Sequence, residues 1–176
     1  MQLSIVGCPD KVHFRPFVKR AAIFYAEQLL SKKLMENIYL KIRFDSKLDV
    51  YGYASVGECN DSGKPREFIV ELNPNIGARR ILETLAHEMV HVKQFALCET
   101  NQSLTRWKGI RIKEDDYYVQ PWEVEAFGLE VGLFTKFAIK ESLWEVFDEI
   151  CNPDSPIIKS EIGWKVFSPN DSEALL

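Results

Sequence analysis

Two histidines and a glutamate within five residues carry the chemistry that this sequence suggests. In the stretch ETLAHEMVHVKQF, His87 and His91 are four residues apart, and Glu88 directly follows the first histidine. On a helix, residues i and i+4 lie one above the other, so two imidazoles at this spacing suit a single Zn²⁺ ion. Glu88 then points beside the ion, where a carboxylate takes a proton from activated water.

The residues around this motif predict a buried helix from about Ile76 to Phe95. The remaining positions of this helix from Ile81 onward are mostly apolar, which is typical of a helix with contacts on several sides. One stripe is polar, and its members are Thr84, His87, Glu88, His91 and Gln94. Buried polar groups without a partner are costly, so the stripe predicts a bound ion, and the two histidines favour zinc.

A catalytic zinc ion uses three protein ligands, so a third ligand must come from elsewhere in the chain. His13 is the one other histidine in the sequence, and it lies far upstream, before the first predicted helix. A surface or capping role suits it better. No further histidine follows His91, which excludes a site built from three histidines of this region.

Two downstream glutamates are the candidates for the third ligand. Pro121 opens a predicted helix, and Glu123 and Glu125 stand in its first two turns. The connection from the motif is long enough to bring this helix back against the first one. Gly128 and Gly132 share the face of Glu125 and would allow close packing, which favours Glu125 on spacing alone. Both glutamates remain open as ligands at this point.

The segment FIVELNPNIGARRILETLAHEMVH resembles the approach to the active site in small gluzincin, ImmA/IrrE-type and SprT-like metallopeptidases. The later run from Glu123 to Ala126 matches the E-x-x-A pattern of gluzincins and ImmA/IrrE-type proteins, in which the first glutamate binds zinc. This resemblance implies Glu123 as the ligand. Phe127 stands where those families carry Asn or Asp, and the third histidine of SprT-like proteins has no counterpart here. The resemblance covers residues 68–134.

Hydrolysis of a peptide bond also needs a donor that stabilises the oxyanion. We predict Tyr118 in this role, because it stands just before the helix that carries the glutamates. The same loop also offers Lys108, Arg111 and Tyr117. The resemblance further implies that an extended peptide adds to the strand Glu67–Asn73 by backbone hydrogen bonds.

The predicted fold class is α+β, as a minimal zincin-like domain that spans residues 1–176. A helix from Arg15 to Leu34 comes first, and the motif helix and the glutamate-bearing helix come later. Between them we predict a small three-stranded meander, with strands at Ile38–Phe44, Val50–Val56 and Glu67–Asn73. A short amphipathic segment, 142–151, leads into a tail, 152–176, that we expect to wrap around the domain or to be partly disordered.

The composition narrows the class of protein. The net charge of −4 counts against a nucleic-acid partner, because such proteins usually present a basic face. The N-terminal apolar run is too short for a signal peptide or a membrane span, so we expect no membrane contact. The four cysteines form no C-x-x-C pair, which indicates reduced thiols and a cytoplasmic protein. The oligomeric state is not indicated.

Together these features predict a zinc-dependent metallopeptidase that cleaves an intracellular polypeptide. Two alternatives stay open. One is a zinc-binding regulator that recognises a specific protein with narrow or no turnover. The other is a DNA-associated protease of the SprT type, against which the acidic charge balance counts.

Overall fold

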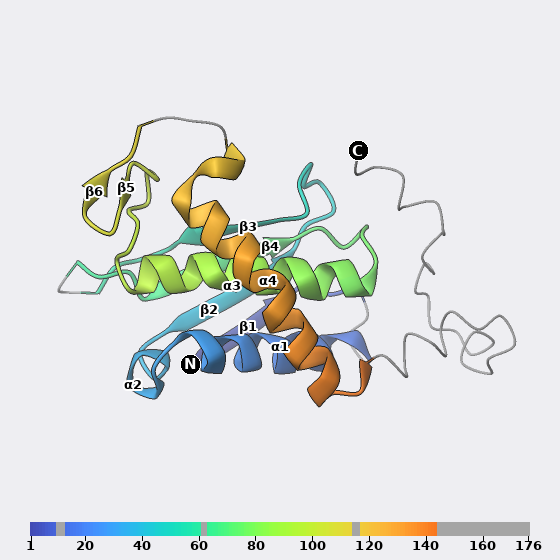
Figure 1. Cartoon of the computed structure of the whole chain (residues 1–176). Coiled ribbons are helices and arrows are strands. Elements are labelled where there is room, and N and C mark those ends of the chain that lie inside the picture. Colours follow the sequence, from blue (N-terminus) through green and yellow to red (C-terminus); the bar gives the residue numbers. More distant parts are fainter. Residues whose placement is uncertain (10–12, 61–62, 114–116, 144–176) are drawn as a thin grey trace, which may run out of the picture.

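The computed structural model describes residues 1–9, 13–60, 63–113 and 117–143. Within these residues, four helices accompany a small mixed sheet (Figure 1). The sheet order is β1-β2-β4-β3, with bounds, in that order, of Gln2–Val6, Tyr39–Phe44, Glu67–Leu72 and Gly52–Val56. β1, β2 and β4 are parallel, whereas β3 is antiparallel to β4. The predicted combination of helices with a small sheet is therefore present.

The prediction of a three-stranded meander is wrong in two respects. Gln2–Val6 forms an additional strand, which pairs in parallel with β2. In addition, β4 lies between β2 and β3, so the strands are not neighbours in chain order. Parallel strands need a long crossover connection, and α1 provides it between β1 and β2. Pairing of this kind depends on distant segments, which is why the local pattern of residues did not predict it.

The position of β4 also corrects the predicted docking strand. β4 has a partner strand along both of its edges, so no extended peptide is able to add to it. In the described part of the sheet, the open edges belong to β1 and β3.

Two helices cover one face of the main sheet, α1 (Phe14–Leu29) and α3 (Ala78–Ala96) (Figure 1). Alternate residues of β2 and β4 point toward these helices and are buried: Leu40, Ile42, Phe44, Phe68, Val70 and Leu72. On the other face, Arg43 forms an ion pair with Glu71 of the neighbouring strand. This alternation is typical of a sheet that is covered on one side.

The first helix is shorter than predicted. α1 ends at Leu29, Leu30 is extended, and a separate short helix, α2, spans Lys32–Met35. Ser31 caps α2, because its side chain accepts a hydrogen bond from the Leu34 N–H at 3.3 Å. Serine favours such a capping position over the interior of a helix, and this explains the break within the predicted range Arg15–Leu34.

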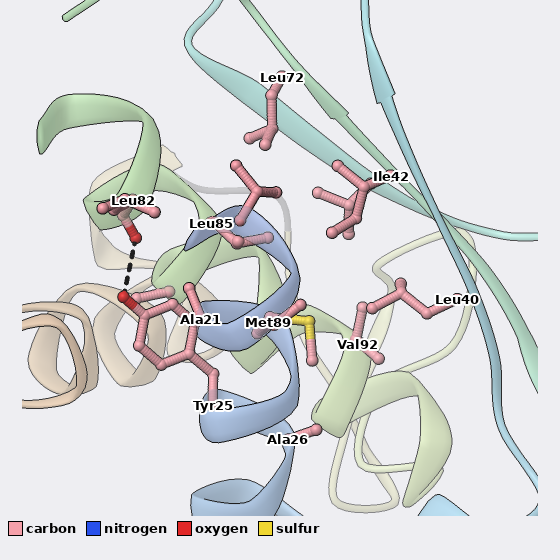
Figure 2. Packing of buried hydrophobic residues seen from close by; sticks show 14 of the residues in the cluster. Ala21, Tyr25, Ala26, Leu40, Ile42, Leu72, Leu82, Leu85, Met89 and Val92 are labelled. Carbon is pink, nitrogen blue, oxygen red and sulfur yellow. Dashed lines mark hydrogen bonds between the residues drawn. The ribbon is translucent and has the colours of Figure 1, made fainter. Parts of the chain in front are cut away.

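α3 is the central helix of the fold, and its predicted buried character is confirmed. Of its 19 residues, 14 are buried, because the sheet and α1 pack against it on one side and α4 on another. Figure 2 shows Leu85, Met89 and Val92 among residues of α1 and β2. The buried Tyr25 hydroxyl of α1 donates a hydrogen bond to the Leu82 carbonyl oxygen at 3.2 Å (Figure 2).

The second helix of the predicted site, α4, spans Pro121–Lys140 and crosses α3 (Figure 1). It begins at Pro121 as predicted. The stretch from Glu99 to Gln120, expected to be turn-like, contains a short hairpin and one turn of 3₁₀ helix. These elements are β5 (Arg106–Trp107), β6 (Ile110–Arg111) and η1 (Tyr117–Val119).

Some predictions concern segments beyond these elements. Residues 144–151 of the predicted amphipathic segment and the whole tail, 152–176, lie outside the described residues. Among the described residues, Cys8, Cys59 and Cys98 form no disulfide bond, while Cys151 also lies outside the described range. None of the helices in the described part of the chain combines the length and the apolar character that a bilayer crossing requires.

Candidate metal centre

α3 and α4 bring three of the predicted site residues together. His87 and His91 lie on successive turns of α3, and their Nε2 atoms are 3.2 Å apart. Glu123, in the first turn of α4, places Oε2 3.3 Å from His87 Nε2 and Oε1 3.5 Å from His91 Nε2. All three side chains are buried, and one potential ligand atom from each lies within 4.8 Å of the others. This group is suited to hold a metal ion.

The three distances agree with tetrahedral coordination. Two ligand atoms that each lie about 2.0–2.1 Å from a tetrahedral ion are roughly 3.3 Å from one another. The observed separations of 3.2, 3.3 and 3.5 Å are close to this value, although the last two involve different oxygens of Glu123. Glu123 Oε2 is buried and makes no hydrogen bond of acceptable geometry. A buried carboxylate oxygen of this kind needs a cation.

The protonation of the histidines supports the same conclusion. His87 Nδ1 lies 3.2 Å from Glu130 Oε2, and His91 Nδ1 lies 2.9 Å from Gln94 Oε1. Both neighbours are oxygen acceptors, so each Nδ1 carries the proton and each neutral ring presents a lone pair at Nε2. Two lone pairs 3.2 Å apart repel each other unless a proton or a metal ion lies between them.

The charges of the metal-free group show that the site formed by His87, His91 and Glu123 favours a positive ion. Burial lowers the pKa of His87, but its contacts with Glu123 and Glu130 outweigh burial and raise the pKa to about 9. Burial raises the pKa of Glu123, but the two histidines outweigh it and hold the pKa at about 2. Without a metal, a proton therefore supplies the positive charge beside Glu123 at neutral pH.

Glu125, the alternative ligand, is directed elsewhere. Lys93 Nζ donates to both of its carboxylate oxygens at 3.0 Å, and Gln94 Nε2 donates to Oε2 at 3.0 Å. The pKa of Glu125 is raised by burial, yet these partners hold it below its usual value. Among the described residues, only Glu123 of the two candidates joins the histidine pair.

Glu88 lies beside the histidines rather than among the potential ligands. It is buried, and burial raises its pKa to about 7, although the neighbouring histidines act in the opposite direction. The backbone of Ala54 in β3 donates a hydrogen bond to its carboxylate. Gly52 of β3 also lies beside Glu88, since a Cβ atom added at this position would lie 3.2 Å from Glu88 Cγ. A carboxyl group with a pKa near neutrality is suited to accept and return a proton.

Tyr117, the neighbour of the predicted donor Tyr118, interacts with the candidate ligand Glu123. Burial and an interaction with the Glu123 carboxylate raise the pKa of Tyr117. The ring of Tyr118 instead lies 5.8 Å from the ring of Phe127, and 68% of Tyr118 is exposed. Because a 3₁₀ helix turns through about 120° per residue, the two neighbouring tyrosines of η1 point in different directions.

The other candidates belong to the β5–β6 hairpin and to the start of α1. Lys108 lies 3.7 Å from Glu99 and Glu125, on the β5–β6 hairpin, and Arg111 is exposed on the same hairpin. His13 is an exposed residue at the start of α1, as the sequence led us to expect.

No protein-family model, no curated protein and no solved structure matches the chain.

Proposed function

We propose that this protein is a zinc-dependent metallopeptidase. Its ligands would be His87, His91 and Glu123, as in the glutamate-type sites that the sequence resembles. The observation that carries the proposal is the closeness of three buried side chains, in which the two histidine Nε2 atoms and the Glu123 carboxylate oxygens approach one another to 3.2–3.5 Å. Two imidazoles and one carboxylate favour zinc over the oxygen-seeking ions Mg²⁺ and Ca²⁺. The minimal zincin-like architecture belongs to the same proposal.

In this function, zinc would polarise the substrate carbonyl and lower the pKa of the attacking water. Glu88 accepts the proton of that water and returns it to the leaving amine, a role that suits a buried carboxyl group beside the two histidines. The Tyr117 hydroxyl, which interacts with Glu123, would stabilise the oxyanion in place of Tyr118.

An extended polypeptide is the substrate that the surroundings favour. β3 lies at an open edge of the described sheet and also contacts Glu88 through Ala54. A peptide that added to this edge by backbone hydrogen bonds would pass beside the general base. β3 thus takes over the role that we predicted for β4.

One experiment tests the proposal as a whole. The purified protein is analysed for bound metal and then incubated with a mixture of unstructured peptides, with and without a chelator. We expect about one zinc per chain, cleavage of at least one peptide, loss of cleavage with the chelator and recovery when zinc is returned. Cleavage that survives complete removal of metal would contradict the mechanism.

A further inference from the structure

Each of the two histidines on α3 has its own oxygen acceptor on the side away from Glu123. Glu130 Oε2 lies 3.2 Å from His87 Nδ1, and Gln94 Oε1 lies 2.9 Å from His91 Nδ1. We propose that Glu130 and Gln94 are the positioning residues of the metal centre, which hold both rings with Nε2 toward the ion. The assignment rests on the proposed metal site but not on peptidase activity.

Glu130 reaches His87 from the same helix that supplies Glu123. The two glutamates are seven residues apart, so they lie on the same face of α4, two turns from one another. Phe127, one turn after Glu123, offers no acceptor, and its ring packs 4.6 Å from the His87 ring. The Glu130 carboxylate, one turn further along α4, therefore accepts the hydrogen bond from His87 that Phe127 is unable to accept. Its side chain is 14% exposed, so the contact is largely shielded from water.

Gln94 is fixed more completely than Glu130. It is fully buried, and its Nε2 donates to the Trp122 carbonyl oxygen at 2.9 Å and to Glu125 Oε2 at 3.0 Å. Both N–H groups of the amide are thereby used, so Oε1 must face His91. His91 Nδ1 is then the donor, and its Nε2 is the free ligand atom.

Glu125 contributes to this arrangement indirectly, through its hydrogen bond with Gln94. Lys93 holds its carboxylate at 3.0 Å and is itself 2.6 Å from Glu99. Since Glu125 also accepts from Gln94, an ion-pair network on α3 and α4 orients the amide that orients His91. Glu125, which the spacing of residues favoured as a ligand, thus does not bind the metal in this proposal but fixes the side chain that orients His91. Partners of this kind typically change metal affinity about 10–100-fold when they are removed.

The test uses the full chain with Glu130→Ala, Glu130→Gln and Gln94→Ala, and it measures zinc affinity by competition with a chromogenic chelator. We expect Glu130→Ala to bind zinc about 10–100-fold more weakly and Glu130→Gln, which keeps an oxygen acceptor, to recover part of the loss. Glu141→Ala is the matched control. Glu141 follows α4 as its C-cap residue, its side chain is 17% exposed, and it pairs with Arg20, so its removal costs an ion pair without touching a histidine.

A second readout separates positioning from a general effect on folding. In zinc-loaded protein with ¹⁵N-labelled histidine, we expect both Nδ1-bound protons to exchange slowly with water. Glu130→Ala should abolish this protection for His87 alone, and Gln94→Ala should abolish it for His91 alone.

If the wild type takes up zinc but the variants keep both the slow proton exchange and the zinc affinity, the positioning role is wrong. If the wild type takes up no zinc, the metal centre fails and this assignment fails with it. Normal zinc binding with the expected losses but without hydrolysis supports the positioning role and contradicts only the peptidase.

Discussion

His87 Nε2 and His91 Nε2 face each other at 3.2 Å across one turn of α3. This separation is close to the distance between two ligands of a single tetrahedral ion. Glu123 completes the group from α4, so the candidate site joins two helices that are far apart in sequence. α4 crosses α3 at the level of the motif, and its first turn brings Glu123 to the two histidines.

Separate substitutions of the two candidate glutamates test this choice of ligand. Glu123→Ala should leave purified protein almost without zinc, because one of three ligands is lost. Glu125→Ala should keep zinc with a modest loss of affinity, since Glu125 only orients Gln94. Metal analysis of both proteins after dialysis against trace zinc gives the answer. The reverse pattern, with zinc lost only from Glu125→Ala, would overturn the assignment.

Glu88→Gln tests the general base. The amide is nearly isosteric with the carboxyl group but does not accept a proton from water, so we expect hydrolysis to fall by about 10²–10⁴-fold while zinc content stays normal. Glu83→Gln is the control on the same helix, because Glu83 pairs with Arg79 and Arg80 near the surface. Hydrolysis by Glu88→Gln at the wild-type rate would show that the mechanism is wrong.

The motif helix could be predicted from the sequence because its evidence is local. The apolar periodicity, the polar stripe and the opening of α4 by Pro121 all lie within single elements, and the structure confirms these elements. The stripe even contained Gln94, although its role as a histidine partner needed Trp122 and Glu125 from another helix.

The remaining features depend on segments that meet only in the fold. β1 pairs with β2 after a crossover, and β4 enters between β2 and β3, so neither strand order nor the open edge follows from alternation. Tyr117 and Tyr118 are adjacent and identical in type, so the sequence does not show that Tyr117 interacts with Glu123; this depends on the orientation of η1 in the fold. The spacing of Glu123 and Glu130 on one helical face was a usable signal for Glu130.

The pH dependence of stability should differ between metal-free and zinc-loaded protein. The pKa of His87, about 9, lies above its ordinary value of 6.5, so its contribution is complete below about pH 6.5 and is lost as the pH rises through 9. Glu88, with a pKa raised to about 7, also binds its proton more tightly when folded, so its ionisation destabilises the native state as the pH rises above about 4.5. Metal-free protein should therefore become less stable between pH 6 and 9.

Zinc reverses this trend, because it binds the deprotonated histidines and displaces the proton. We expect the difference in unfolding temperature between zinc-loaded and chelator-treated protein to increase from pH 6 to pH 9. Thermal unfolding followed by circular dichroism measures it directly. The variant His87→Ala serves as the control and should show a much smaller dependence on pH. A difference that stays constant or shrinks with pH in the wild type would contradict the assigned protonation states.

Tyr117→Phe should reduce the turnover number by about 10–10³-fold, with little change in zinc affinity, because a single oxyanion donor is removed. Tyr118→Phe is the natural control, since its ring packs near Phe127 and the substitution keeps the ring. Steady-state kinetics on one peptide substrate compares the two variants. A larger fall in turnover number for Tyr118→Phe than for Tyr117→Phe would favour Tyr118 as the oxyanion donor, as predicted from the sequence.

Gly52→Ala tests how closely β3 and the general base are packed. A Cβ atom at Gly52 would lie 2.5 Å from Thr84 Cγ2 and 3.2 Å from Glu88 Cγ, so β3 or the Thr84 side chain must shift, and the Glu88 side chain must give way by a smaller amount. We expect hydrolysis to fall more than zinc affinity, because Glu88 is not a ligand. Gly128→Ala is the control, since a Cβ atom at Gly128 meets nothing within 4 Å and alanine favours the helix.

A second substitution identifies the cause of that loss. Thr84→Ser removes the Cγ2 methyl group that a new Cβ at Gly52 would strike and keeps the hydroxyl. The double variant Gly52→Ala/Thr84→Ser should therefore regain part of the activity and of the unfolding temperature lost in Gly52→Ala. Additive losses in the double-mutant cycle would mean that the two sites do not interact, and that the contact between β3 and α3 does not position Glu88.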